Sequence, residues 1–194
     1  YVFAGDGCLM EGVSQEAITL AGRQELSKLI VFWDNNNITI DGKVDLADAT
    51  NQVDRFKSSG WHVLEIDGHD PIQIDHAIIE AKKSNKPTMI ACKTHIALGS
   101  SAQDTSKGHG ALTDKSLIEE TKKVYGWSQD AFFVPTEVKA AWEKIGKKGH
   151  EKKLSWENRF SAISQKKQSE FLRIYSMEVP VALNKAINKF KKTI

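Results

Sequence analysis

The stretch YVFAGDGCLMEG, residues 1–12, joins an apolar run to a lone acid between two glycines. Its first four residues are typical of a buried strand, and residues 12–26 (GVSQEAITLAGRQEL) follow with the apolar spacing of a helix. Residues 28–34 (KLIVFWD) form a second continuous apolar run. A strand–helix–strand crossover returns the chain in the same direction. We therefore expect both strands to end at one edge of a parallel sheet.

The same alternation of apolar and amphipathic runs continues to the middle of the chain. Residues 61–67 and 87–95 are expected to be further strands. Between them, residues 70–83 are expected to form a helix capped by Asp70, with Pro71 at its first position. Strands that are apolar on both faces and separated by helices predict an α/β fold, with a parallel sheet covered by helices on both faces.

The rest of the chain is predicted to be a loop and then a helical extension, with no strand after Val134. The expected segments are a Gly- and Ser-rich loop at 96–112 and helices at 114–127, 135–176 and 182–194, the second of them broken near residues 146–149. We therefore divide the chain into a partial α/β domain, residues 1–127, and a helical extension and linker towards a missing second domain, residues 128–194.

Composition excludes some classes of function. The net charge is only +2, and we interpret the Lys-rich residues 143–194 as a solvated helical face, so no nucleic-acid partner is expected. No apolar run approaches the ~20 residues of a membrane span, so no membrane partner is expected either. Cys8 and Cys92 are far apart, and we expect both thiols in a core, in a reducing compartment. Because the chain starts inside a strand and without Met, we expect it to be part of a longer chain.

Polar groups follow the first two predicted strands: Asp6, and Asn36 in the run DNNN. Neighbouring strands lie ~4.8 Å apart, so these side chains can meet at the edge where α/β sheets bind ligands. Carboxylate and amide oxygens suit Mg²⁺ or Ca²⁺. Gly5 and Gly7 would let a diphosphate approach, and a helix starting at residues 11–13 would offer free N–H groups. Each run alone is also a common turn, but the pairing favours a metal–diphosphate site.

Longer segments resemble a known family. GDGCLMEGVSQEAITLAG (residues 5–22) and KLIVFWDNNNITIDG (residues 28–42) look like the thiamine diphosphate signature of transketolases. The similarity continues through FKSSGWHVLEIDGHD (residues 56–70), KPTMIACKT (residues 86–94) and GHGA (residues 108–111). It covers residues 1–127 well and the helical remainder only in general character.

The resemblance implies metal ligands and an interface. Asp6 would bind Mg²⁺ through its carboxylate, Asn36 through its amide oxygen and Ile38 through its backbone carbonyl. Glu11 and Glu16 resemble family acids near the subunit interface. The alternatives are that Asp6 and Asn36 only form turns, that Ile38 is an ordinary core residue, and that the two glutamates belong to a solvated helical face.

The resemblance also implies contacts to the cofactor. Gly7 and Asn36 would bind the diphosphate end, and Ile40 would pack near the thiamine rings. His109 would lie near the diphosphate and the substrate, as a cofactor-binding and catalytic residue. The alternatives are that Ile40 is a core residue and that His109 is a solvated loop residue. The other histidines are interpreted as structural: His62, His69, His76, His95 and His150.

The implied function is that of a transketolase segment. The whole enzyme would transfer a two-carbon ketol unit from a ketose phosphate to an aldose phosphate, using thiamine diphosphate and Mg²⁺. It would be a cytoplasmic homodimer of the pentose phosphate pathway or the Calvin cycle. The glutamate that activates the cofactor in the family lies in a segment absent from this sequence, so the isolated chain is expected to be inactive.

Other readings stay open at this point. The loop lacks the family's prolines after Gly-Ser and after His-Gly-Ala. Another thiamine diphosphate enzyme, such as deoxyxylulose phosphate synthase, is one alternative, although GDGCLMEG and GHGA favour transketolase. A non-catalytic subunit of a split enzyme is a second alternative.

Overall fold

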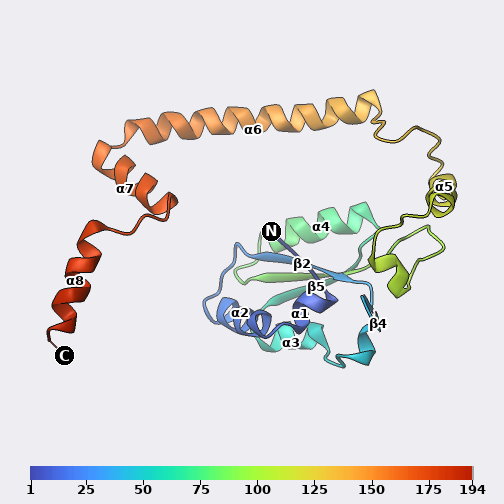
Figure 1. Ribbon diagram of the computed structural model, residues 1–194, viewed down its shortest axis with the longest axis horizontal. Coiled ribbons are helices and arrows are strands. Elements are labelled where there is room, and N and C mark those ends of the chain that lie inside the picture. The colour runs from blue at the N-terminus through green and yellow to red at the C-terminus, as the bar shows by residue number, and fades with distance from the viewer. Residues whose placement is uncertain (194) are drawn as a thin grey trace. The chain divides into compact units, whose positions relative to one another are not determined.

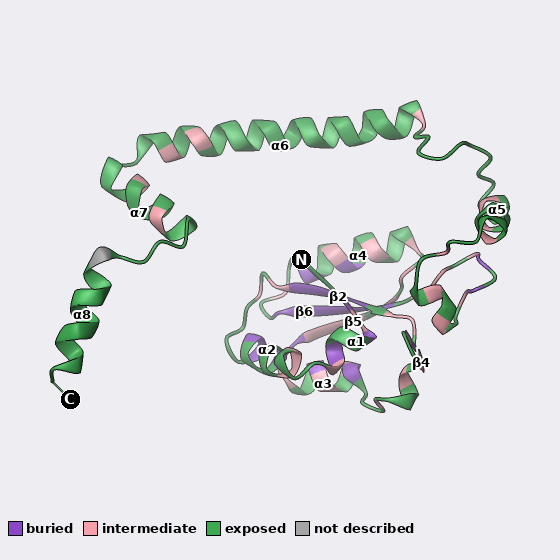
Figure 2. Ribbon diagram, viewed as in Figure 1, coloured by how far each residue is buried: buried purple, intermediate pink, exposed green. Residues whose placement is uncertain are grey.

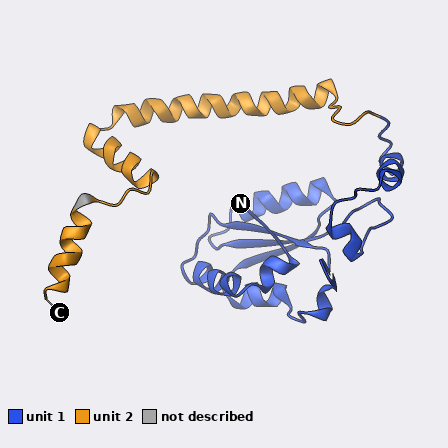
Figure 3. Ribbon diagram, viewed as in Figure 1, with its two compact units in different colours: residues 1–128 blue, residues 129–194 orange. Residues whose placement is uncertain are grey.

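Figure 1 shows the computed structural model, which describes residues 1–193 apart from the side chain of Val181. Tertiary contacts divide the chain into two units, Tyr1–Ser128 and Gln129–Ile194 (Figure 3). We call them unit 1 and unit 2. That the first is a partial binding domain, and the second a linker towards another domain, remains a prediction.

Unit 1 is built on a four-stranded parallel sheet in the order β1-β2-β6-β5 (Figure 1). The strands are β1 (Val2–Gly5), β2 (Ile30–Asn35), β6 (Thr88–Lys93) and β5 (His62–Asp67). Each overlaps a run predicted to be a strand. With helices on both faces of the sheet, the predicted α/β fold class is confirmed.

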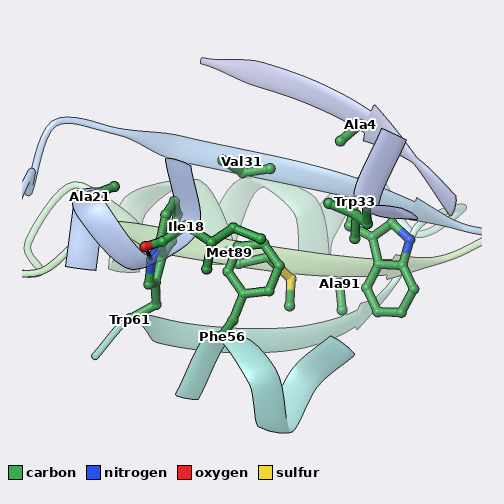
Figure 4. Close-up of a cluster of buried hydrophobic side chains, with 10 residues drawn as sticks. Ala4, Ile18, Ala21, Val31, Trp33, Phe56, Trp61, Met89 and Ala91 are labelled. Carbon is green, nitrogen blue, oxygen red and sulfur yellow. Dashed lines mark hydrogen bonds between the residues drawn. The ribbon is translucent and has the colours of Figure 1, made fainter. Parts of the chain in front are cut away.

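The two middle strands explain the continuous apolar runs. Residues 30–33 of β2 and 88–92 of β6 are all buried (Figure 2). Successive side chains of a strand point to opposite faces, so each strand contributes to two cores. One core contains Val31, Trp33, Met89 and Ala91 with Phe56 and Trp61 (Figure 4), and the other contains Ile30, Phe32, Ile90 and Cys92 with Ala77 and Ala81.

Helix α2 (Gly12–Arg23) is the crossover between β1 and β2. Its backbone approaches the segment before β5 very closely. A Cβ atom on Gly22 would lie 1.8 Å from the carbonyl oxygen of Ser59, so only glycine fits there. Nearby, Trp61 Nε1 donates a hydrogen bond to the carbonyl oxygen of Ile18 (2.9 Å). These contacts fix α2 against one face of the sheet.

Helix α4 (Pro71–Ala81) contributes to the opposite core through Ala77 and Ala81. It begins as predicted, with Pro71 in its first turn. The Oδ1 atom of Asp70 accepts hydrogen bonds from the backbone N–H groups of Ile72 (2.8 Å) and Gln73 (3.4 Å). The predicted cap is therefore confirmed.

Helix α3 (Gln52–Ser58) was not predicted from the sequence. Asn51 caps it, because its Oδ1 atom accepts a hydrogen bond from the N–H of Asp54 (3.1 Å). Phe56, which is 1% exposed, packs from this helix edge-on against Trp61, with 4.9 Å between the ring centroids. One buried aromatic side chain thus anchors a helix too short to show an apolar period.

Short elements surround the carboxyl edge of the sheet. They are α1 (Asp6–Met10), the antiparallel pair β3 (Ile38–Thr39) and β4 (Gly42–Lys43), and the 3₁₀ turns η1 (Val44–Leu46) and η2 (Ser106–His109). The expected helix start at residues 11–13 is confirmed, because α2 begins at Gly12 with Glu11 as its N-cap. The short helix α1 before it, which begins at Asp6, was not predicted.

Helical structure continues after the sheet. The helices are α5 (Lys115–Val124) in unit 1, and α6 (Thr136–Ala162), α7 (Gln165–Tyr175) and α8 (Val181–Lys191) in unit 2. The expected break near residues 146–149 is wrong, because α6 runs through it. Gly146 and Gly149 each cost about 1 kcal/mol of helix stability relative to alanine. The many Lys, Glu and Ala residues around them are good helix formers and offset that cost. The helix ends at Ala162, and the backbone of the next residue, Ile163, is extended.

The cysteine prediction is half right. Cys92 is buried on β6, but Cys8 is exposed on α1, so the two thiols do not share a core. No disulfide joins them. Among the described residues, no helix is both long and apolar enough to cross a membrane.

Candidate metal and diphosphate site

Asp6 occupies the first position of α1, directly after β1, and is 7% exposed. Its Oδ1 atom accepts a hydrogen bond from Trp33 Nε1 (2.9 Å), and its Oδ2 atom accepts one from the backbone N–H of Asn37 (3.1 Å). Trp33 lies in β2, and Asn37 lies in the turn that follows β2. The carboxylate of the first strand end is therefore held by the second.

The electrostatics of Asp6 favour a cation. Burial raises the pKa of Asp6 above its ordinary value of 3.8, although the hydrogen bonds from Trp33 and Asn37 lower it. The negative charge of Asp34 raises the pKa further. A cation beside this carboxylate would favour its ionised form and offset both costs.

Asn36 lies at the same edge of the sheet. The strand register pairs Gly5 with Asp34, so Asp6, which follows Gly5, and Asn36, which lies two residues after Asp34, stand at the same end of neighbouring strands. This is the arrangement that the crossover predicts. Asn36 Oδ1 accepts a hydrogen bond from the N–H of Ile38 (3.0 Å), and Asn36 Nδ2 donates one to Asp34 Oδ2 (3.2 Å).

The two glycines around Asp6 leave open space. A Cβ atom on Gly5 or Gly7 would meet no other atom within 4 Å. Contacts within the chain therefore do not require glycine at either position. Room beside an acid at a strand end is what a bulky anion carried by a metal ion needs.

The other predicted residues fall into different environments. Ile38 is 8% exposed on β3, whereas Ile40 in the following turn is 70% exposed. Strand β3 contacts η2, whose last residue is His109, so the structure brings the segment of His109 beside Ile38. Gly7, Glu11, Glu16 and His109 are exposed. The roles of all these residues remain predictions.

The sequence did not reveal three partners of the predicted ligands: Trp33, Asp34 and Thr94. Trp33 binds Asp6, and Asp34 binds Asn36, as described above. Thr94, at the end of β6, donates a hydrogen bond from Oγ1 to Asp34 Oδ1. Asp34 stands within the DNNN run and Trp33 beside it, so both were within reach of sequence reasoning. Thr94 carries no local signal, because only the sheet brings it close.

Two of the histidines interpreted as structural stabilise the loop that contains His109. His69 Nε2 accepts a hydrogen bond from the backbone N–H of His95 (2.9 Å), and the two rings stack with 5.8 Å between their centroids. His95 Nδ1 in turn pairs with Asp104 (2.9 Å). These contacts tie the start of the loop to its middle.

The donors at the sheet edge fit a hard divalent cation. Across the part of the chain that the structure describes, no three His, Cys, Asp or Glu side chains gather as a metal site. The predicted site differs in kind, because it combines one carboxylate, one amide and one backbone carbonyl. Three oxygens leave positions open for ligand oxygens, as Mg²⁺ prefers.

Comparison with known proteins defines the family. The model of the family described as "Transketolase, thiamine diphosphate binding domain" matches residues 1–180. The chain belongs to this family of thiamine diphosphate-binding domains. The match extends over the sheet, the candidate site and most of the helical unit.

Individual relatives agree. The chain is 50% identical to a transketolase of Rhodobacter capsulatus over 193 residues, which cover 99% of this chain and 29% of the relative. It is 44% identical to a transketolase of Sinorhizobium medicae, covering 88% of this chain and 25% of the relative. The chain therefore spans less than a third of the length of these relatives.

Solved structures show the same fold. A Pichia stipitis transketolase in complex with sedoheptulose-7-phosphate superimposes with a TM-score of 0.84 and is 41% identical. The match covers 96% of this chain and 29% of that one. A Campylobacter jejuni transketolase has a TM-score of 0.80 at 36% identity, covering 87% of this chain and 27% of that one.

Proposed function

We propose that this chain provides the metal–diphosphate site of a transketolase. The intact protein would transfer a two-carbon ketol unit from a ketose phosphate to an aldose phosphate, with thiamine diphosphate and Mg²⁺ as cofactors. The observation that carries the proposal is the position of Asp6 and Asn36 at the same edge of the sheet, within a chain of the thiamine diphosphate-binding family. The sugar phosphate in the Pichia stipitis structure supports the substrate class.

Each candidate residue of the chain would have its own role in binding the cofactors or the substrate. Asp6, Asn36 and the carbonyl of Ile38 would hold Mg²⁺, with Ca²⁺ as a possible substitute. Gly7 would donate its N–H to the diphosphate, and thiamine diphosphate, when bound, would supply the stabilisation of negative charge on carbon that the reaction needs. Ile40 and His109 would line the space towards the thiamine rings and the substrate.

The wider setting is part of the same proposal. We propose a homodimer whose active site lies at the subunit interface, with Glu11 and Glu16 near that interface. We place the reaction in the cytoplasm, in the pentose phosphate pathway or the Calvin cycle. Two unpaired cysteines support a reducing compartment. That every relative named above is a transketolase favours this enzyme over another thiamine enzyme or a split subunit.

A ketol-transfer assay tests the proposal. The intact protein that carries this chain, supplied with thiamine diphosphate, Mg²⁺, xylulose 5-phosphate and ribose 5-phosphate, is expected to form a seven-carbon ketose phosphate. The chain alone is expected to form none. An intact protein that binds the cofactor but transfers no ketol unit would refute transketolase activity. Turnover by the chain alone would refute the assignment of roles.

A further inference from the structure

We propose that Asp34 and Thr94 are positioning residues that orient the Asn36 amide with its oxygen facing the metal ion. Neither would touch the metal. The inference rests on the proposed function, because it assigns Asn36 a metal to bind. It goes further by naming two residues, on two different strands, that set the geometry of one ligand.

The first step is the orientation of the amide. An asparagine side chain has one end that accepts and one that donates, and only the oxygen end can bind a metal. The carboxylate of Asp34 can only accept, so it takes the Nδ2 end of Asn36 (3.2 Å). The backbone N–H of Ile38 can only donate, so it takes the Oδ1 end (3.0 Å). The two partners together exclude the flipped amide.

The second step is what holds Asp34. Its side chain is exposed and would rotate freely if it were unsupported. Its two oxygens instead have separate partners, because Oδ2 accepts from Asn36 and Oδ1 accepts from the hydroxyl of Thr94. Thr94 follows directly after β6, and its backbone N–H also donates to the carbonyl oxygen of Asn35 (3.2 Å). The carboxylate is therefore fixed between two neighbouring strand ends.

The third step is what orients Thr94. A Cβ atom on Gly68 would lie 2.5 Å from the methyl carbon of Thr94, so the methyl group packs directly on this glycine. The N–H of Gly68 donates to the carbonyl oxygen of Lys93 (2.8 Å), which fixes the glycine beside β6. With its methyl group packed on Gly68, Thr94 presents its hydroxyl to Asp34. The chain of contacts thus runs from Gly68 through Thr94 and Asp34 to Asn36.

The experiment separates the hydroxyl of Thr94 from its shape. Thr94→Val keeps the shape and removes the donor, whereas Thr94→Ser keeps the donor and removes the methyl group. In the intact protein, Mg²⁺ is titrated calorimetrically at a fixed concentration of thiamine diphosphate, and melting is measured without either. Thr94→Val is expected to weaken Mg²⁺ binding about tenfold, the lower end of the effect of mutating the outer-shell residues of a metal site, because Thr94 acts on Asn36 only through Asp34. Thr94→Ser is expected to lose less Mg²⁺ affinity than Thr94→Val, because it keeps the donor, and both variants should melt like the parent without cofactor.

The Mg²⁺ titration tests the role of Thr94 separately from the proposed function. Parent-like Mg²⁺ binding by Thr94→Val would overturn the inference and leave the proposed function intact. Equal weakening by both variants would overturn it too, because packing and not the hydroxyl would then matter. Failure of the parent protein to bind Mg²⁺ and thiamine diphosphate would instead refute the proposed function. If Thr94→Val does not fold, Asp34→Asn carries the test with the same criteria, since its amide no longer fixes which end of Asn36 it faces.

Discussion

The two units of the chain differ in how far their helices and strands are buried. Every buried residue of the described chain belongs to unit 1, where the sheet and its helices exclude water from two cores. The described side chains of unit 2 are all exposed or half-exposed, including large ones such as Trp142 (70%) and Phe190 (65%). Tertiary packing determines the first unit. In the second, local periodicity is enough to specify helices but does not create an interior.

The difference also concerns chemistry. All predicted ligands lie in unit 1, at the edge where parallel strands end. Unit 2 contributes aromatic contacts between its own helices, such as the stacked pair Trp156 and Phe160 and the contact between Phe160 and Phe171. Changes in unit 1 should therefore affect cofactor binding and the stability of the fold, whereas matched changes in unit 2 should affect neither strongly.

The largest expected effect is the loss of the acid in the candidate site. In the intact protein, Asp6→Ala should weaken binding of Mg²⁺ with thiamine diphosphate by at least about a hundredfold, because it removes a charged ligand. Calorimetry measures this directly. The matched control is Glu151→Ala, which removes an exposed acid from α6. Near-normal affinity for Asp6→Ala would remove Asp6 from the site.

The next effect compares one substitution in two settings. Phe56→Ala empties a position that is 1% exposed and should cost about 3–5 kcal/mol of unfolding free energy. Phe132→Ala truncates a fully exposed side chain of unit 2 and should change stability by less than about 0.5 kcal/mol. Urea denaturation of the chain measures both. Similar losses for the two variants would contradict the contrast between the units.

A thiol reagent tests unit 1 alone, because both cysteines lie there. Burial, together with the charge of Asp34, raises the pKa of Cys92 to about 11, so very little thiolate forms at about pH 8. Cys8 is exposed. One thiol of the chain should therefore react more than about tenfold faster than the other, and Cys8→Ser should abolish the fast phase. Loss of the slow phase instead would reverse the assignment.

The smallest effect concerns helix caps and pH. Hydrogen bonds from the side chain of Gln73 and the N–H of Ile72 lower the pKa of Asp70 below its ordinary value of 3.8. Because the folded-state pKa is the lower one, this stabilisation is complete above the ordinary value and is lost as the pH falls through the lowered one. Asp70→Ala should slightly reduce the melting temperature at neutral pH, and the difference from the parent should shrink in acid.

Ser164→Ala is the matched control in unit 2. Ser164 precedes α7, but its side chain makes no capping hydrogen bond, so no change in melting temperature is expected. A drop as large as that of Asp70→Ala would show that unit 2 depends on its caps as unit 1 does.

Periodicity and topology predicted the four strands of the parallel sheet and most helices of the fold, but not the short pair β3 and β4. They could not predict α3, whose seven residues depend on the cap of Asn51 and the burial of Phe56. They also placed a break at Gly146 and Gly149, where glycine alone is too small a penalty to stop a long helix. Exposure of Cys8 was missed because α1, the short helix that contains it and buries only Asp6 and Leu9, was not predicted.

The candidate site was also predictable only in part. The crossover rule places Asp6 and Asn36 at the same edge of the sheet without any coordinates, and the strand register agrees with this placement. The supporting residues were not predictable, because Thr94 reaches Asp34 only through the order of the strands in the sheet. Local sequence indicates which groups meet a ligand, whereas tertiary structure determines what holds them in place.

Gly22 shows how far such support extends. Because the carbonyl of Ser59 occupies the space of any side chain there, a mutation to alanine would push α2 away from the sheet. Helix α2 lies between β1 and β2 in the chain and packs on the core that both strands share, so its displacement would disturb the strand ends that precede Asp6 and Asn36. As sequences of this family diverge, natural selection should therefore tolerate almost no change at Gly22, although the residue touches no ligand.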